Sequence, residues 1–133
     1  MMMKALTYPL LIILLFFTSC KQYPESGGIS GNDQRDIDIA KINLMLSSVS
    51  EHAIKNNDSA LIELNNAKDL ADSIGFAEGV AKALFLKGNL MYIRNEYQEA
   101  LELYSQALQL AEVKQNILLK AQCLERMASV HLV

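Results

Sequence analysis

Residues 81–112 read AKALFLKGNLMYIRNEYQEALELYSQALQLAE and contain two apolar stripes at helical spacing. In each half, apolar or small residues recur at intervals of three and four, which is typical of amphipathic helices. Gly88 lies inside the first pattern, although Gly costs about 1 kcal/mol relative to Ala in a helix. We therefore expect another backbone to pass close to Gly88. The pattern breaks at Asn95-Glu96, which predicts a helical hairpin with a tight turn there.

This hairpin resembles the tetratricopeptide repeat, a motif of two packed helices. The resemblance rests on six signature positions, Leu84, Gly88, Tyr97, Ala100, Tyr104 and Ala107. The chain departs from the family at Leu84, where Trp is usual, at Lys87, where Leu is usual, and at Glu112, where Pro often closes the unit. The resemblance implies an all-α fold, a short right-handed solenoid of stacked antiparallel hairpins.

The sequence also aligns with itself at a shift of forty residues. Leu44, Leu84 and Leu124 fall together at this shift, and the small residues Ser48, Gly88 and Ala128 do the same. The alignment predicts repeat 1 at about 41–80, repeat 2 at about 81–120 and a partial repeat 3 at about 121–133. The usual tetratricopeptide period is 34, so we expect the extra residues between hairpins, around 73–79 and 113–119.

The periodicity predicts about five helices within a folded domain at 35–133. Their expected ranges are 35–55, 59–74, 77–94, 97–113 and 116 to the end. The fifth should pack on the fourth through the stripe Leu118, Ala121, Leu124, Met127, Ala128 and Val130. The face meant for a sixth helix would stay open. Either the chain is a fragment of a longer protein, or the last helix packs on a partner, including by self-association.

The N-terminus predicts export and lipid attachment. Residues 1–19 combine Lys4 with an apolar run that is too short to span a membrane, as in a signal peptide. The sequence Phe17-Thr18-Ser19-Cys20 resembles the bacterial lipobox, in which Cys20 would be lipidated. An ordinary secretory leader with an incidental Cys is the alternative. Residues 20–34, rich in Gly and Ser, predict a flexible tether from Cys20.

The sequence gives no indication of catalysis. Beyond Cys20 there are eleven basic and fifteen acidic residues, a balance that argues against a nucleic-acid surface. His52 and His131 lie on separate repeats, and there is no metal-binding motif or Gly-rich phosphate loop. We predict no enzyme activity, no metal and no cofactor. Cys123 is expected to be a buried, inert thiol.

The resemblance implies protein–protein interaction as the function. A partner peptide or helix would bind a concave groove lined by the first helix of each hairpin. The residues expected in it are Val49, His52, Phe85, Asn89, Tyr92, Glu125 and Ser129. Alternatively, Phe85 and Tyr92 simply cover the core between repeats.

We expect such a protein at the periplasmic or outer-membrane face of a cell envelope, held by its lipid. A different class of function also fits the forty-residue repeat. The chain would then be the N-terminal sensory segment of a membrane-bound regulator, a histidine kinase or DNA-binding protein that continues beyond Val133.

Overall fold

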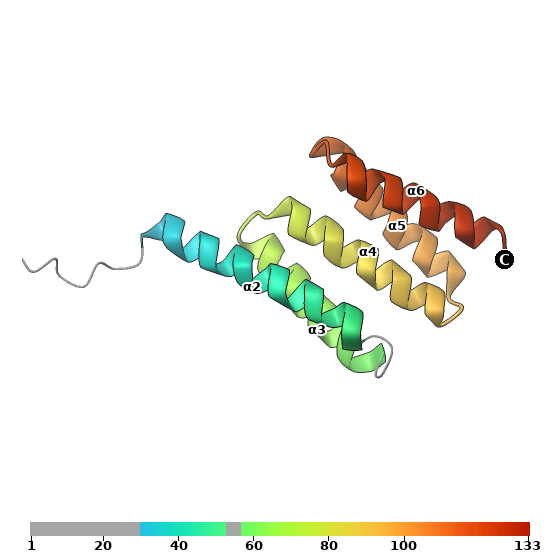
Figure 1. Ribbon diagram of the computed structural model, residues 1–133, viewed down its shortest axis with the longest axis horizontal. Coiled ribbons are helices and arrows are strands. Elements are labelled where there is room, and N and C mark those ends of the chain that lie inside the picture. The colour runs from blue at the N-terminus through green and yellow to red at the C-terminus, as the bar shows by residue number, and fades with distance from the viewer. Residues whose placement is uncertain (1–29, 53–56) are drawn as a thin grey trace, which may run out of the picture. The chain divides into compact units, whose positions relative to one another are not determined.

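The computed structural model describes residues 30–52 and 57–133, in which all regular structure is helical. These residues form five helices, as the sequence predicts, and no strand (Figure 1). The compact unit that contains them runs from Asn32 to Val133. The helices are α2 (Gly31–His52), α3 (Asn57–Ser73), α4 (Ala77–Ile93), α5 (Tyr97–Val113) and α6 (Ile117–His131).

The helices form a stack of antiparallel hairpins, which confirms the predicted all-α architecture. Along the chain, α4 packs against both α3 and α5, and α6 packs against α5. In Figure 1, α2, α4 and α6 run in one direction, while α3 and α5 run back between them. Helices α4 and α6 are also in contact with each other. The first helices of successive hairpins are therefore neighbours.

Three turns of the same conformation join α3 to α6. The middle residue of each turn has a positive φ, which is 66° at Gly75, 64° at Asn95 and 54° at Gln115. In each turn, the residue after this middle residue donates its backbone N–H to the carbonyl five residues earlier. These bonds join Phe76 to Ala71 at 2.8 Å, Glu96 to Met91 at 2.9 Å and Asn116 to Ala111 at 2.8 Å. This pairing satisfies carbonyls that a helix end would otherwise leave unpaired.

The repeated turns correct the expected location of the extra residues. Helices α3, α4 and α5 each contain 17 residues. The turns at 74–76, 94–96 and 114–116 have equal length, so no long connection separates one hairpin from the next. The forty-residue period therefore arises from longer helices rather than from longer loops. The expectation of extra residues between hairpins was wrong.

Helix α2 differs from the prediction at its start. It begins at Gly31 rather than Arg35, so residues 31–34 of the expected tether are helical. Asp33 lies in the first turn, where a carboxylate interacts favourably with the helix dipole. The residue types that suggested a loop are thus also suited to a helix start. The remaining tether and the signal peptide, residues 1–29, lie outside the described residues.

One repeat position of α2 differs in burial from the equivalent position of α4. Leu44, which aligns with Leu84 and Leu124, is 70% exposed, whereas Ile42, Leu46 and Val49 are buried.

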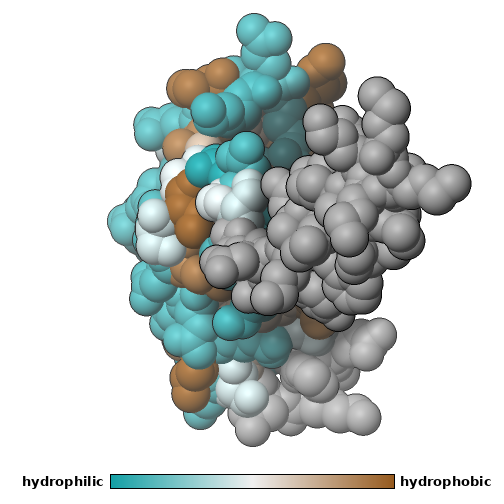
Figure 2. Space-filling view, turned by 90° about the vertical axis from the view of Figure 1, so that its left-hand side faces the viewer, coloured by the Kyte–Doolittle hydropathy of each residue, from teal (hydrophilic) through white to brown (hydrophobic). Residues whose placement is uncertain are grey.

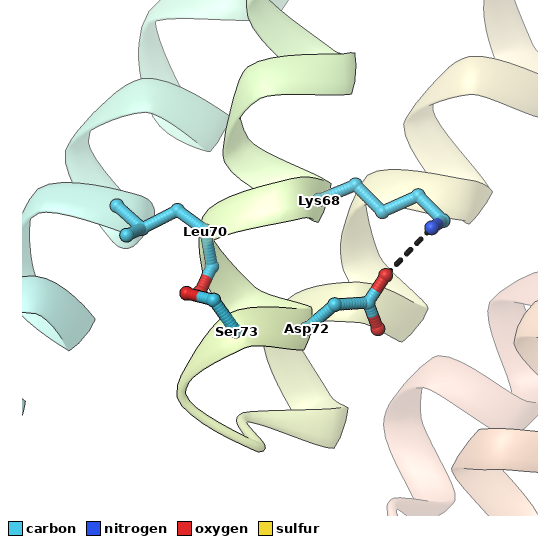
Figure 3. Close-up of polar contacts among 4 residues, drawn as sticks. All are labelled: Lys68, Leu70, Asp72 and Ser73. Carbon is cyan, nitrogen blue, oxygen red and sulfur yellow. Dashed lines mark hydrogen bonds and ion pairs between the residues drawn. The ribbon is translucent and has the colours of Figure 1, made fainter.

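On the face shown in Figure 2, the coloured surface is mainly hydrophilic, with hydrophobic residues in separate patches. On α3, Lys68 Nζ lies 2.7 Å from Asp72 Oδ2, and Ser73 Oγ donates to the Leu70 carbonyl at 2.7 Å (Figure 3). An exposed pair of this spacing contributes only about 0.3–0.5 kcal/mol, so stability depends mainly on the core. Within residues 30–52 and 57–133, no helix is both long and apolar enough to cross a membrane.

Candidate functional site

The interface between α4 and α5 holds the signature residues and fixes the orientation of α4. Leu84, Ala100, Tyr104 and Ala107 are at most 5% exposed, Gly88 is buried, and Tyr97 is half-buried. A Cβ at Gly88 would lie 2.6 Å from Cε1 of Tyr104. The close contact at Gly88 is thus made by an aromatic ring, not by the backbone that the sequence suggested.

Tyr104 is held in place by contacts with Asn89 and Phe85 of α4. Its hydroxyl donates to Asn89 Oδ1 at 2.8 Å. Its ring centroid lies 5.7 Å from that of Phe85, at an interplanar angle of 48°. Offset or tilted aromatic pairs of this kind contribute about 0.5–1.5 kcal/mol beyond their burial. Tyr104, whose ring lies against Gly88, therefore fixes the orientation of Phe85 and Asn89 on α4.

A groove of about 560 Å³ lies between α2, α4 and α6, the first helices of successive hairpins. Its apolar lining residues Leu46, Phe85, Leu86 and Leu119 are buried or half-buried, whereas Leu118 is exposed. Of its polar lining residues, Asn43, Ser47 and Gln122 are exposed, and Lys82 and Asn116 are half-buried. The groove therefore has an apolar floor and a polar rim.

Local structure at the start of α6 places two of the leucines. Asn116 precedes the helix, and its Oδ1 accepts a hydrogen bond from the Leu119 N–H at 3.0 Å. This N-cap fixes the first turn of α6, and the turn brings Leu118 and Leu119 to the groove. On α4, Lys82 Nζ lies 3.0 Å from Glu78 Oε1. Among the described residues that line the groove, Lys82 alone is charged.

Of the six expected groove residues whose side chains the structure describes, only Phe85 lines this groove. Val49 is 2% exposed and belongs to the core. Asn89 bonds to Tyr104, and the Tyr92 ring packs edge-on against Tyr97 at 5.5 Å. Glu125 is exposed, and its carbonyl accepts a hydrogen bond from Ser129 Oγ at 2.9 Å. The side chain of His52, at the end of α2, lies outside the described part of the chain.

The sequence contains a signal that could have located the groove. Leu46 and Leu86 are forty residues apart, as are Lys82 and Gln122, and all four line it. The period thus marks the same part of successive first helices. The expected residues were chosen further along these helices, where the side chains instead make contacts with α5 or within α6.

Of the six residues predicted to pack α6 against α5, only Met127 and Val130 face the core. The buried residues of α6 are Leu119, Cys123 and Val130, with Met127 half-buried. Leu118, Ala121, Leu124 and Ala128 are exposed. The last three align with Ala81, Leu84 and Gly88, of which Gly88 contacts the following helix, α5, through Tyr104.

Cys123 is buried with a free thiol, as predicted. Loss of hydration on burial raises the pKa of Cys123 from 9.0 to about 11. Burial likewise raises the pKa of Tyr104 from 10.0 to about 12, although Arg126 acts in the opposite direction. At neutral pH, neither group carries charge, so neither is prepared for nucleophilic chemistry. No cluster of possible metal ligands occurs among the described residues.

These shifts predict how stability depends on pH. Both groups hold their protons more tightly in the folded chain, so their contribution to stability is fully present below about pH 9. It is lost as pH rises towards 11 and 12, where the folded groups ionise. We expect Cys123→Ala to reduce the loss of stability between pH 9 and 11, as measured by urea unfolding. Identical pH dependence in both proteins would contradict this assignment.

Comparison of the chain with family models, with curated proteins and with solved structures gives no match.

Proposed function

We propose that this chain is a non-catalytic binding protein of the tetratricopeptide type that holds a segment of a partner protein in the groove between α2, α4 and α6. The observation that carries the proposal is the lining of this groove by three successive first helices. Such a lining extends across the stack, and it therefore suits an elongated ligand better than a compact small molecule.

The chemistry of the lining supports a peptide ligand. The apolar floor accommodates one or two apolar side chains, whose burial supplies most of the binding free energy. Asn43 and Gln122 are exposed at the rim, and their amides can both donate to and accept from a peptide backbone. Lys82 is already paired with Glu78, so a strongly acidic ligand is not required. We infer a mainly apolar, uncharged recognition segment.

A random peptide library selected on the purified chain tests this proposal. The variant Leu118→Arg places a charge at the groove, and Leu44→Arg makes the same change at a residue that does not line it. The two leucines are 71% and 70% exposed, so neither change should disturb folding. We expect selected peptides to bind the wild type and Leu44→Arg equally. Leu118→Arg should bind at least about tenfold more weakly, the effect of a moderate interface residue.

Equal binding by both arginine variants would show that the selected peptides do not use the groove. Failure to select any peptide with an apolar anchor would count against the proposed ligand chemistry. The circular dichroism spectra of the variants serve as the check that both remain folded.

We also propose that the protein is exported and anchored in the cell-envelope membrane through lipid on Cys20. The support is the sequence around Cys20, which lies outside the described residues. Several acyl chains at one site give stable attachment, because each buried methylene contributes about 0.8 kcal/mol.

Cys20→Ala should abolish lipid attachment and move the protein out of the membrane fraction, or block its processing. Metabolic labelling with palmitate and fractionation measure both effects. Cys123→Ala is the matched control, because Cys123 is buried in α6 and should not affect labelling. A Cys20→Ala protein that still incorporates palmitate and remains with the membrane would contradict the lipoprotein assignment.

A further inference from the structure

A partly buried hydrogen bond joins α2 to α3. Ser48 Oγ of α2 donates to Glu63 Oε1 of α3 at 2.6 Å. The same hydroxyl also reaches the Met45 carbonyl, one turn earlier in α2, at 2.8 Å. Hydrogen bonds depend on distance and angle, whereas apolar contacts are non-directional. The bond to Glu63 therefore restrains the orientation of α2 relative to α3 more closely than apolar packing alone does.

The second hairpin has no polar pair at the corresponding positions. Ser48 and Glu63 lie forty residues before Gly88 and Leu103. Leu103 is 7% exposed and belongs to the hydrophobic core, so a leucine is compatible with this position of a second helix. Exchanging hydrogen-bonding groups for apolar groups of similar shape is often nearly neutral in stability. A role other than stabilising the hairpin therefore accounts better for Glu63.

Apolar residues alone do not determine which side of α2 faces the core. Ile42 and Leu46 are buried. Ile37 and Leu44 are apolar as well, but they are 52% and 70% exposed. At about 100° of rotation per residue, Leu44 lies nearly opposite Ile42 on the helix. A rotated α2 would bury Ile37 and Leu44 instead, and the directional bond from Ser48 distinguishes the two orientations.

The orientation of α2 decides which of its side chains reach the groove. Helix α2 lines the groove with Asn43, Leu46 and Ser47. Ser48 directly follows Ser47, and it lies about 140° around the helix from Asn43. Glu63 therefore holds α2 on the side away from the groove. A rotation of α2 after loss of this bond would turn the groove-lining side chains away from those of α4 and α6.

On the basis of the peptide groove proposed above, we propose that Glu63 is a positioning residue for the ligand. Its bond to Ser48 fixes the rotation of α2 that brings Asn43, Leu46 and Ser47 to the groove. Glu63 is not among the residues that line the groove, so it acts through α2 rather than by touching the peptide. Peptide binding and stability should therefore respond differently when Glu63 is replaced.

The variant Glu63→Leu introduces the residue that the second hairpin has at the corresponding position. The Ser48 hydroxyl keeps the Met45 carbonyl as a partner, so no buried donor is left unpaired. We expect the urea midpoint of unfolding to stay the same or to rise. The affinity for peptides selected on the wild type should fall at least about tenfold.

Two variants serve as controls for this measurement. Glu63→Gln keeps a side-chain oxygen that accepts a hydrogen bond from Ser48, so it should bind the peptides as the wild type does. Glu99→Leu makes the same substitution on the exposed face of α5, and it should leave peptide affinity unchanged. Together they separate the hydrogen bond from the charge and from the added leucine.

Spin labels report the position of α2 without any peptide. In a Cys20→Ser background, labels are attached at Leu44→Cys and Leu124→Cys, because both leucines are exposed and lie on separate helices. Cys123 is buried and does not compete for the label. The distance distribution between the labels should shift or broaden in Glu63→Leu, and Glu63→Gln should restore the wild-type distribution.

An unchanged distance distribution in Glu63→Leu would overturn the proposal, and so would wild-type peptide affinity in this variant. A large fall in its urea midpoint would also overturn it, because Glu63 would then act through stability. Equal loss of binding in Glu63→Gln and Glu63→Leu would mean that the bond to Ser48 is not what matters. Failure of the groove itself is a separate result, seen as equal binding by Leu118→Arg and the wild type, and the distance measurement does not depend on it.

Discussion

Replacing Tyr104 by Ala should lower the free energy of unfolding by about 3–5 kcal/mol, the cost of removing a large buried ring. Tyr104 is 0% exposed, and its ring fills the space over Gly88 and against Phe85. The backbone cannot close such a space, because both helices are fixed by Schellman-type turns at 94–96 and 114–116. Urea unfolding followed by circular dichroism measures the loss.

Tyr104→Phe is the matched control for this substitution. It keeps the ring and removes only the hydroxyl that donates to Asn89, so the expected loss is about 1 kcal/mol. If Tyr104→Phe destabilised the chain as much as Tyr104→Ala, the hydrogen bond rather than the packed ring would hold α4 to α5. That result would contradict the description of the hairpin core.

Gly88→Leu should cost at least about 2 kcal/mol, as expected for overpacking of a filled core. Its Cβ alone would lie 2.6 Å from the Tyr104 ring, which cannot move away without losing the bond to Asn89. Glu99→Leu, on the exposed face of α5, should change stability by at most about 0.5 kcal/mol. Equal melting temperatures for the two variants would refute close packing at Gly88.

The double variant Gly88→Leu/Tyr104→Ala tests whether the Tyr104 ring is the group that contacts Gly88. Because the ring is what Gly88 accommodates, Gly88→Leu should cost much less in a Tyr104→Ala protein than in the wild type. Contacting residues typically show such non-additivity of about 0.5–3 kcal/mol. Strictly additive effects would mean that a different group, such as the α5 backbone, lies closest to Gly88.

The sequence predicts the α4–α5 hairpin well because several independent signals agree there. The apolar stripes, the small residues at Gly88 and Ala100 and the turn at Asn95 all specify the same packing. The bounds of α5 are as predicted, and α4 ends within one residue of the prediction. What the sequence could not supply was the identity of the contact at Gly88, since a small residue accommodates a ring or a backbone equally well.

Helices α2 and α6 were predicted less well, because each has a neighbouring helix on only one side among the described residues. The buried stripe of α2 follows Ile42, Leu46 and Val49, and the alignment of Leu44 with Leu84 and Leu124 does not mark it. In α6, apolar residues occur on two faces, and periodicity alone does not tell which face meets α5. Burial of Cys123 and exposure of Leu124 settle that choice.

The groove was the hardest feature to predict, since it depends on how three helices from separate hairpins are spaced. Its lining includes an N-cap, Asn116, and the exposed Leu118, neither of which belongs to a repeat signature. Sequence reasoning chose positions by family resemblance, and among those whose side chains are described only Phe85 lines the groove. The others lie further along the first helices, and the repeat pattern does not show how far along them the groove extends.

The central claim is that the groove between α2, α4 and α6 binds a peptide, and backbone amide chemical shifts of the isotope-labelled chain test it most directly. On titration with a selected peptide, we predict that the largest changes fall at Leu46, Leu86, Leu119 and Gln122, with little change on the outer faces of α3 and α5. Saturable changes confined to α3 and α5, or spread evenly over the chain, would contradict the claim.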